Sequence, residues 1–141
     1  MVFRSPCTIF VIKFVIDMDE ALKKKLRNDP TGLKTYEYIA NNIGNIDDIM
    51  PELVENMIEV DRSGQFVVST ARYLNAIDRE KYAASIDLLV KAAIVKDRER
   101  AYLPDLAASI WGADYKEHAQ QLSETDDNFR RIYKRLYPVG I

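Results

Sequence analysis

Apolar and polar positions alternate with a helical period along most of the chain. From residue 33 onward, apolar residues recur at intervals of three and four, and the breaks between these stretches carry Gly, Pro, Asp or Ser. Residues typical of helix ends mark several boundaries, among them Gly44, Pro51, Asp78 and Gly112. The pattern predicts helices at about 33–43, 47–60, 65–77, 79–100, 104–111, 114–123 and 125–137. We therefore predict an all-α fold, a compact bundle of about seven helices.

The most apolar run, residues 8–16, allows two interpretations. Six of its nine residues are β-branched, which favours a strand. Ser5-Pro6, however, has the form of a helix start, and apolar positions continue at helical spacing as far as Leu26. We predict a helix over about 6–27, with a single strand at 8–16 as the alternative. The run carries more apolar surface than one face of a bundle helix buries, so we expect self-association through it.

The chain shows no sign of division or of membrane insertion. No Gly-rich or Ser-rich linker interrupts it, so residues 1–141 are expected to form a single helical domain. The run 8–16 is shorter than the about 20 residues that span a bilayer. Lys13 interrupts it and no small-residue cleavage site follows, which argues against a signal peptide. With a single cysteine, Cys7, the chain is expected to be cytoplasmic, without a membrane partner.

Composition excludes several kinds of chemistry. The 141 residues are 48% hydrophobic and 30% charged, which is typical of a chain that folds. One histidine (His118) and one cysteine (Cys7) cannot form a Cys/His zinc site, a histidine-ligated di-iron site or a disulfide. The common nucleotide-binding, hydrolase and metalloprotease motifs do not occur. We therefore expect no enzymatic activity, no metal and no cofactor.

The net charge of −2, from 20 basic and 22 acidic residues, conceals an acidic stretch at 47–61 that contains no Lys or Arg. Glu52, Glu55 and Glu59 are spaced to share one helix face, a candidate docking face for a basic protein surface. A solvated face without a partner is the alternative. The corner at 35–53 has the spacing of a helix-turn-helix, but its acidic second helix would repel DNA phosphates.

A basic stretch lies near the C-terminal end. Residues 128–137 hold four cations and three aromatic residues and no acid. The candidate binding residues of this stretch are Arg130, Arg131, Lys134, Arg135, Phe129 and Tyr133. Three interpretations stay open: binding of RNA or single-stranded DNA, an electrostatic contact with the acidic stretch within one chain or between two, and simple solvation of a helix end.

The sequence as a whole favours a non-enzymatic protein–protein interaction module, structural or regulatory, that self-associates as a homodimer or larger homo-oligomer. Its expected partner is a protein, either a second copy or another chain. The alternative function is a nucleic-acid-associated accessory protein that uses the basic aromatic stretch. No known family is indicated by these motifs.

Overall fold

The computed structural model describes residues 18–138, which contain eight α-helices, two short 3-10 helices and no strand. The helices are α2 (Glu20–Arg27), α3 (Leu33–Asn42), α4 (Met50–Val60), α5 (Gln65–Asp78), α6 (Ala83–Lys96), α7 (Leu103–Trp111), α8 (Ala119–Thr125) and α9 (Asp127–Leu136), with η1 (Asp47–Ile49) and η2 (Tyr115–His118). The predicted all-α fold is confirmed. The choice between helix and strand at 8–16, and self-association through that run, lie outside the described residues.

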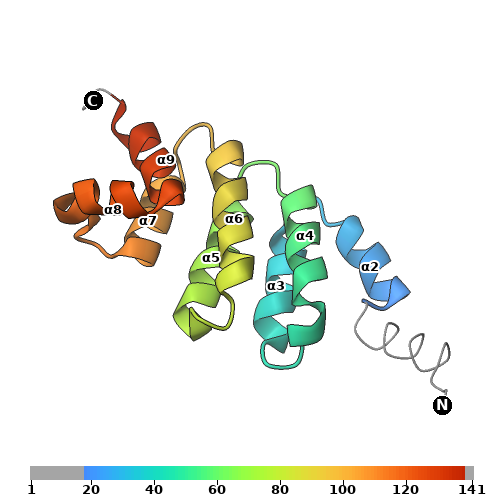
Figure 1. Ribbon diagram of the computed structural model, residues 1–141. Helices are drawn as coiled ribbons and strands as arrows, with labels where there is room; N and C mark the ends of the chain where they lie inside the picture. The colour runs from blue at the N-terminus through green and yellow to red at the C-terminus, as the bar shows by residue number, and fades with distance from the viewer. Residues whose placement is uncertain (1–17, 139–141) are drawn as a thin grey trace, which may run out of the picture.

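The helices form two layers, and successive helices from α2 to α7 alternate between them (Figure 1). In one layer, α5 packs between α3 and α7. In the other, α4 packs between α2 and α6, and α6 also contacts α9. The chain is therefore a series of helix pairs, α3 with α4 and α5 with α6, closed by α7 with α8 and α9. Such an array has extended outer faces, because each pair contacts mainly its neighbours.

The core lies between the two layers. Leu53 and Met57 of α4, and Leu89 and Ala93 of α6, are completely buried, so apolar residues at helical spacing form the inner faces of these two helices. Phe129 anchors α9 and is also fully buried. Helical periodicity identified these positions because burial of one stripe stabilises each helix in the array.

Three buried aspartates hold the array together at the turns that join successive pairs. Asp29, Asp61 and Asp97 follow α2, α4 and α6, and at most 4% of each residue is exposed. Each carboxylate accepts hydrogen bonds from backbone N–H groups at the start of the next helix. In every turn the N–H group six positions after the aspartate donates at 2.8 Å, from Thr35, Val67 and Leu103 respectively. These are charge-assisted caps, stronger than bonds between neutral groups.

The ionisation of Asp29 shows the strength of such a cap. Burial disfavours the charged form and by itself raises the pKa of this carboxyl. Hydrogen bonds from Thr35, Gly32 and Thr31 to the carboxylate outweigh that effect, and the pKa of Asp29 lies below its ordinary value of 3.8. Asp29 is therefore charged at neutral pH in the folded chain.

The three turns also share a backbone conformation. The third residue after each aspartate has a left-handed backbone, with φ of +106° at Gly32, +95° at Gly64 and +57° at Arg100. Glycine adopts this conformation without a steric penalty, whereas a residue with a Cβ is strained there. The turn after α6 therefore repeats the geometry of the first two but places an arginine where they have glycine.

We expect Arg100→Gly to raise the free energy of unfolding by about 0.5–1 kcal/mol, because it relieves the left-handed strain. A urea titration should show a higher midpoint with an unchanged slope. Arg98→Gly in the same turn is the control. The backbone of Arg98 is not left-handed, so glycine there relieves no strain and only increases the entropy of the unfolded chain, which lowers stability. If both variants lowered stability equally, the proposed strain at residue 100 would be wrong.

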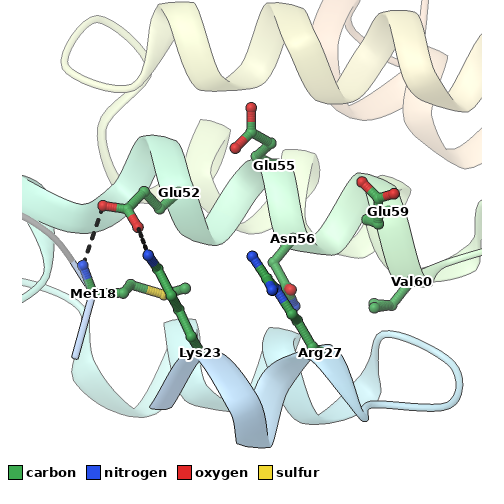
Figure 2. A pocket seen from close by; sticks show the side chains of 8 residues that line it. All are labelled: Met18, Lys23, Arg27, Glu52, Glu55, Asn56, Glu59 and Val60. Atoms are coloured by element: carbon green, nitrogen blue, oxygen red, sulfur yellow. Dashed lines mark hydrogen bonds and ion pairs between the residues drawn. The ribbon is translucent and has the colours of Figure 1, made fainter. Parts of the chain in front are cut away.

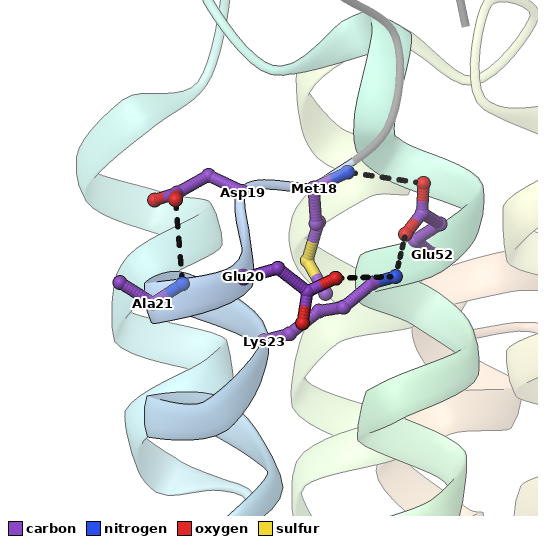
Figure 3. Close-up of polar contacts among 6 residues, drawn as sticks. All are labelled: Met18, Asp19, Glu20, Ala21, Lys23 and Glu52. Atoms are coloured by element: carbon purple, nitrogen blue, oxygen red, sulfur yellow. Dashed lines mark hydrogen bonds and ion pairs between the residues drawn. The ribbon is translucent and has the colours of Figure 1, made fainter. Parts of the chain in front are cut away.

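Three predicted boundaries need correction. The predicted helix 6–27 does not run through residue 19, because Asp19 has an extended backbone and caps α2 by accepting from the Ala21 N–H (Figure 3). The predicted helix 79–100 starts only at Ala83 and ends at Lys96, where Asp97 turns inward to cap α7. The last helix, predicted from residue 125, starts at Asp127 and is capped by Asp126, which accepts from the Phe129 N–H.

Candidate functional site

The acidic docking face predicted at Glu52, Glu55 and Glu59 lies along α4, but the three glutamates have different surroundings. Glu52 is half-buried, accepts a hydrogen bond from the Met18 N–H at 3.1 Å and lies 4.0 Å from the Lys23 ammonium (Figure 3). Glu55 and Glu59 are exposed and form no ion pair with any residue of 18–138. Glu52 therefore fastens α2 to α4, and only the other two are open to a partner.

A groove of about 590 Å³ separates α2 from α4 beside these glutamates. Its lining consists of Met18, Lys23, Arg27, Glu52, Glu55, Asn56, Glu59 and Val60 (Figure 2). Asn56 at its floor donates to the Leu26 carbonyl at 3.0 Å and to the Thr35 hydroxyl at 3.1 Å. The groove thus carries charges of both signs, and its floor is used in packing α2 against α4.

Two of the four basic candidates on α9, Arg130 and Arg135, are engaged in the fold. Arg130 forms an ion pair with Asp127 one turn earlier. Arg135 donates to the carbonyl oxygens of Ile94 and Asp97, the latter at 2.8 Å. It therefore caps the C-terminal end of α6, where a cation is favoured by the helix dipole. Arg131, which is half-exposed, and Lys134, which is exposed, have no ion-pair partner within residues 18–138.

The aromatic candidates on α9 belong to a packed cluster. The Phe129 ring meets Trp111 edge-on at 5.2 Å and stacks on Tyr133 at 5.5 Å, and Tyr133 in turn contacts Tyr137 at 4.8 Å. Phe129 is fully buried, so it cannot stack on a nucleic-acid base. Tyr133 is half-exposed. The sequence pattern of basic and aromatic residues therefore reflects helix packing more than a stacking platform.

Tyr115 completes this cluster. It is buried, its ring lies edge-on to Phe129, and its hydroxyl lies 3.1 Å from that of Tyr137. Burial, assisted by the neighbouring Tyr137 hydroxyl, raises the pKa of Tyr115 to about 12. The phenol is therefore neutral at physiological pH and acts as a packed hydrogen-bonding group.

The acidic and basic helices do not touch. α4 and α9 lie on opposite sides of α6, and no ion pair joins them within residues 18–138 (Figure 1). The predicted electrostatic contact within one chain is thus wrong for the described residues, because α6 separates the two helices. A contact between two chains stays a prediction.

An exposed apolar stripe on α6, between the two charged helices, was missed in the sequence. Leu88 is 51% exposed and Val95 is 61% exposed, although both belong to a helix in the middle of the layer. They lie seven residues apart, hence on the same side of α6, together with the exposed Ala84. The sequence did contain an indication of this stripe, because 79–100 carries more apolar residues than the buried face of one helix can hold.

We refer to the outward residues of these three helices as the α4–α6–α9 face: Glu55 and Glu59, then Ala84, Leu88 and Val95, then Arg131 and Lys134. Lys91, also exposed on α6, is paired with Asp87 at 2.5 Å. The face therefore shows an acidic edge, a centre that is apolar apart from the Lys91–Asp87 pair, and a basic edge, in that order.

His118 is the remaining candidate for chemistry. Its ring lies 3.2 Å from the Asp114 carboxylate, with 55% and 59% of the two side chains exposed. The shallow hollow beside it is lined by a single stretch of chain, residues 117–124. Efficient general acid–base catalysis needs a substrate held in place beside the imidazole, and this open surface does not enclose one.

Two further features are absent from the described residues, a cluster of metal ligands and a membrane-spanning helix. Among residues 18–138, no three His, Cys, Asp or Glu side chains are placed to hold a metal ion together. Within the same residues, no helix has the length and apolar character that crossing a membrane requires. No family model, curated protein or solved structure matches this chain.

Proposed function

We propose that this protein is a non-enzymatic, cytoplasmic protein-binding module that presents the α4–α6–α9 face to a protein partner. The observation that carries the proposal is the exposure of Leu88 and Val95 at the centre of a helix layer. An apolar centre with charged edges is the arrangement found at protein interfaces, where the core is desolvated and the rim stays wet. The cytoplasmic location is supported by the single cysteine of the chain.

The same face is poorly suited to nucleic acid, the alternative function. Glu55 and Glu59 on its acidic edge would repel phosphates that approached Arg131 and Lys134 along the layer. The N–H groups at the starts of α3, α5 and α7, which bind phosphate in many proteins, already donate to Asp29, Asp61 and Asp97. A protein partner fits this distribution of charge better.

Site-specific photo-crosslinking in the native cell tests the proposal. With a photoreactive phenylalanine analogue at position 88, irradiation should give a discrete protein adduct, because this position lies at the centre of the proposed interface. The same analogue at position 77 is the control, since Ile77 is 49% exposed but belongs to α5 in the other layer. Position 77 should give no comparable adduct.

Two results would overturn the proposal. The first is the absence of any protein adduct at position 88 under conditions in which the analogue is incorporated and the chain is folded. The second is an RNA or DNA adduct at position 88 in place of a protein, which would support the nucleic-acid alternative.

A further inference from the structure

The α4–α6–α9 face is self-complementary, and we infer that its partner is a second copy of this chain. This inference rests on the proposed function and specifies the partner at the same face. It depends on three features: the order of the three helices, their heights, meaning their positions along the direction of α6, and the signs of the charges at the two edges.

The order of the helices determines how two copies can meet. Consider two copies that meet face to face, related by a two-fold axis that runs parallel to α6 in the interface. The rotation brings the α6 stripe of one copy against the same stripe of the other. It also brings α4 of each copy opposite α9 of the other, so that an acidic edge meets a basic edge twice. A contact of this kind closes on itself as a dimer.

The height of α9 along the axis follows from its bonds to α6. Asn128 near the start of α9 donates to Asp87 at 2.8 Å, and Arg135 near its end donates to the carbonyls of Ile94 and Asp97. The two helices therefore run parallel. Arg131, between these contacts, lies level with the middle of α6, and Lys134 lies level with its last turn.

The height of α4 follows from the turns that end α4 and α6. Gly64, which follows α4, lies directly against Asp97, which follows α6. The ends of the two helices are therefore level, and both run in the same direction. Glu55 and Glu59 precede the end of α4 by five residues and one residue, so they are level with Lys91 and Val95 of α6.

A two-fold axis parallel to α6 preserves these heights. Glu55 of one copy then meets Arg131 of the second copy, and Glu59 meets Lys134 of the second copy. Leu88 and Val95 meet their own counterparts across the axis, and so does Lys91, whose charge is balanced by Asp87. All four charged side chains lack an ion-pair partner within residues 18–138, so each is free to form the contact. The pairs select the partner and its orientation, while the apolar stripe is buried.

Sedimentation of purified, full-length charge variants tests this arrangement. Glu55→Lys/Glu59→Lys and Arg131→Glu/Lys134→Glu each place like charges opposite one another twice in a homodimer. We expect the dimer dissociation constant of each variant to rise at least about tenfold over that of the wild type. A 1:1 mixture should regain dimers, because in the mixed dimer both edges again bring opposite charges together.

Matched controls separate this result from a general effect of charge. Glu37→Lys/Asp105→Lys makes the same change in net charge as Glu55→Lys/Glu59→Lys, but on α3 and α7 of the other layer, and it should leave the dissociation constant unchanged. Circular dichroism checks that every variant is folded, which we expect because the altered side chains are not buried.

The outcomes distinguish the inference from the proposed function. A wild-type chain that stays monomeric up to about 1 mM would overturn self-association. So would a mixture that shows no recovery, or species that grow beyond two copies. In any of these cases, a protein adduct of another mass at position 88 would leave the proposed function standing. Absence of every adduct together with a monomeric chain would overturn both.

Discussion

Asp61→Ala should lower the free energy of unfolding by about 3–5 kcal/mol. The Asp61 carboxylate is completely buried and accepts from four backbone N–H groups, those of Ser63, Gly64, Phe66 and Val67, at 2.8–3.0 Å. Alanine leaves these donors without an acceptor at the start of α5. The loss is less than the sum of four charged hydrogen bonds because water can reach the exposed part of the turn.

Denaturant unfolding followed by circular dichroism measures this change. Asp48→Ala is the control, because Asp48 is exposed in η1, just before α4, and accepts no hydrogen bond from residues 18–138, so the expected loss is about 0.5 kcal/mol or less. Hydrogen exchange should show the largest loss of protection at the start of α5. A loss below about 1 kcal/mol for Asp61→Ala would mean that the buried aspartates do not hold the helix pairs together.

Phe129→Ala should also lower the free energy of unfolding by about 3–5 kcal/mol, because it removes a fully buried ring from the joint between α9 and α7. The ring has aromatic contacts with Trp111, Tyr115 and Tyr133, and its removal leaves a cavity that these large rings cannot readily fill. The near-ultraviolet dichroism of the aromatic cluster should fall together with the stability.

Phe129→Leu is the matched variant, because it keeps a large apolar side chain at the same position. We expect it to lose about half as much stability as Phe129→Ala or less. Equal losses would indicate that the shape of the aromatic ring, rather than the volume it fills, dominates at this site. A change below about 1 kcal/mol for Phe129→Ala would contradict the packed role of α9 described above.

Periodicity in the sequence located most of the helices between residues 33 and 137 and the buried positions of α4 and α6, but not every helix boundary. Leu53 and Leu89 are completely buried where the 3.6-residue pattern placed them. The predicted turn at 28–32 and break at 61–64 also occur. The sequence contains a clue to the repeated architecture that the residue-by-residue prediction missed, because Asp-x-Thr-Gly at 29–32 and Asp-x-Ser-Gly at 61–64 lie 32 residues apart.

The third turn shows why the rest was harder to predict. Asp97 belongs to the charged run Lys96-Asp97-Arg98-Glu99-Arg100, which suggests a solvated helix end, yet only 1% of Asp97 is exposed. Its burial depends on the N–H groups of α7, which the chain brings to it only in the folded array. Arg100 in place of glycine also hides the similarity to the first two turns.

The candidate site was predicted only in part, because it too depends on contacts between residues far apart in the sequence. Charge patterns placed Glu55, Glu59, Arg131 and Lys134 in the acidic and basic stretches, but they could not show that Glu52 and Arg135 are used within the fold. Nor could they show that α6 lies between the two stretches. Local sequence reports which side chains share a helix face, whereas the order of helices in a layer depends on contacts between distant residues.

The mass of the photo-crosslinked adduct at position 88 tests the central claim of a protein-binding face most directly. We expect one protein adduct at twice the 16.2 kDa of the chain, and none of comparable yield at position 77. A single protein adduct of another mass would retain the binding face and replace the partner. Unreacted chain alone at position 88, with the probe incorporated and the protein folded, would contradict the claim.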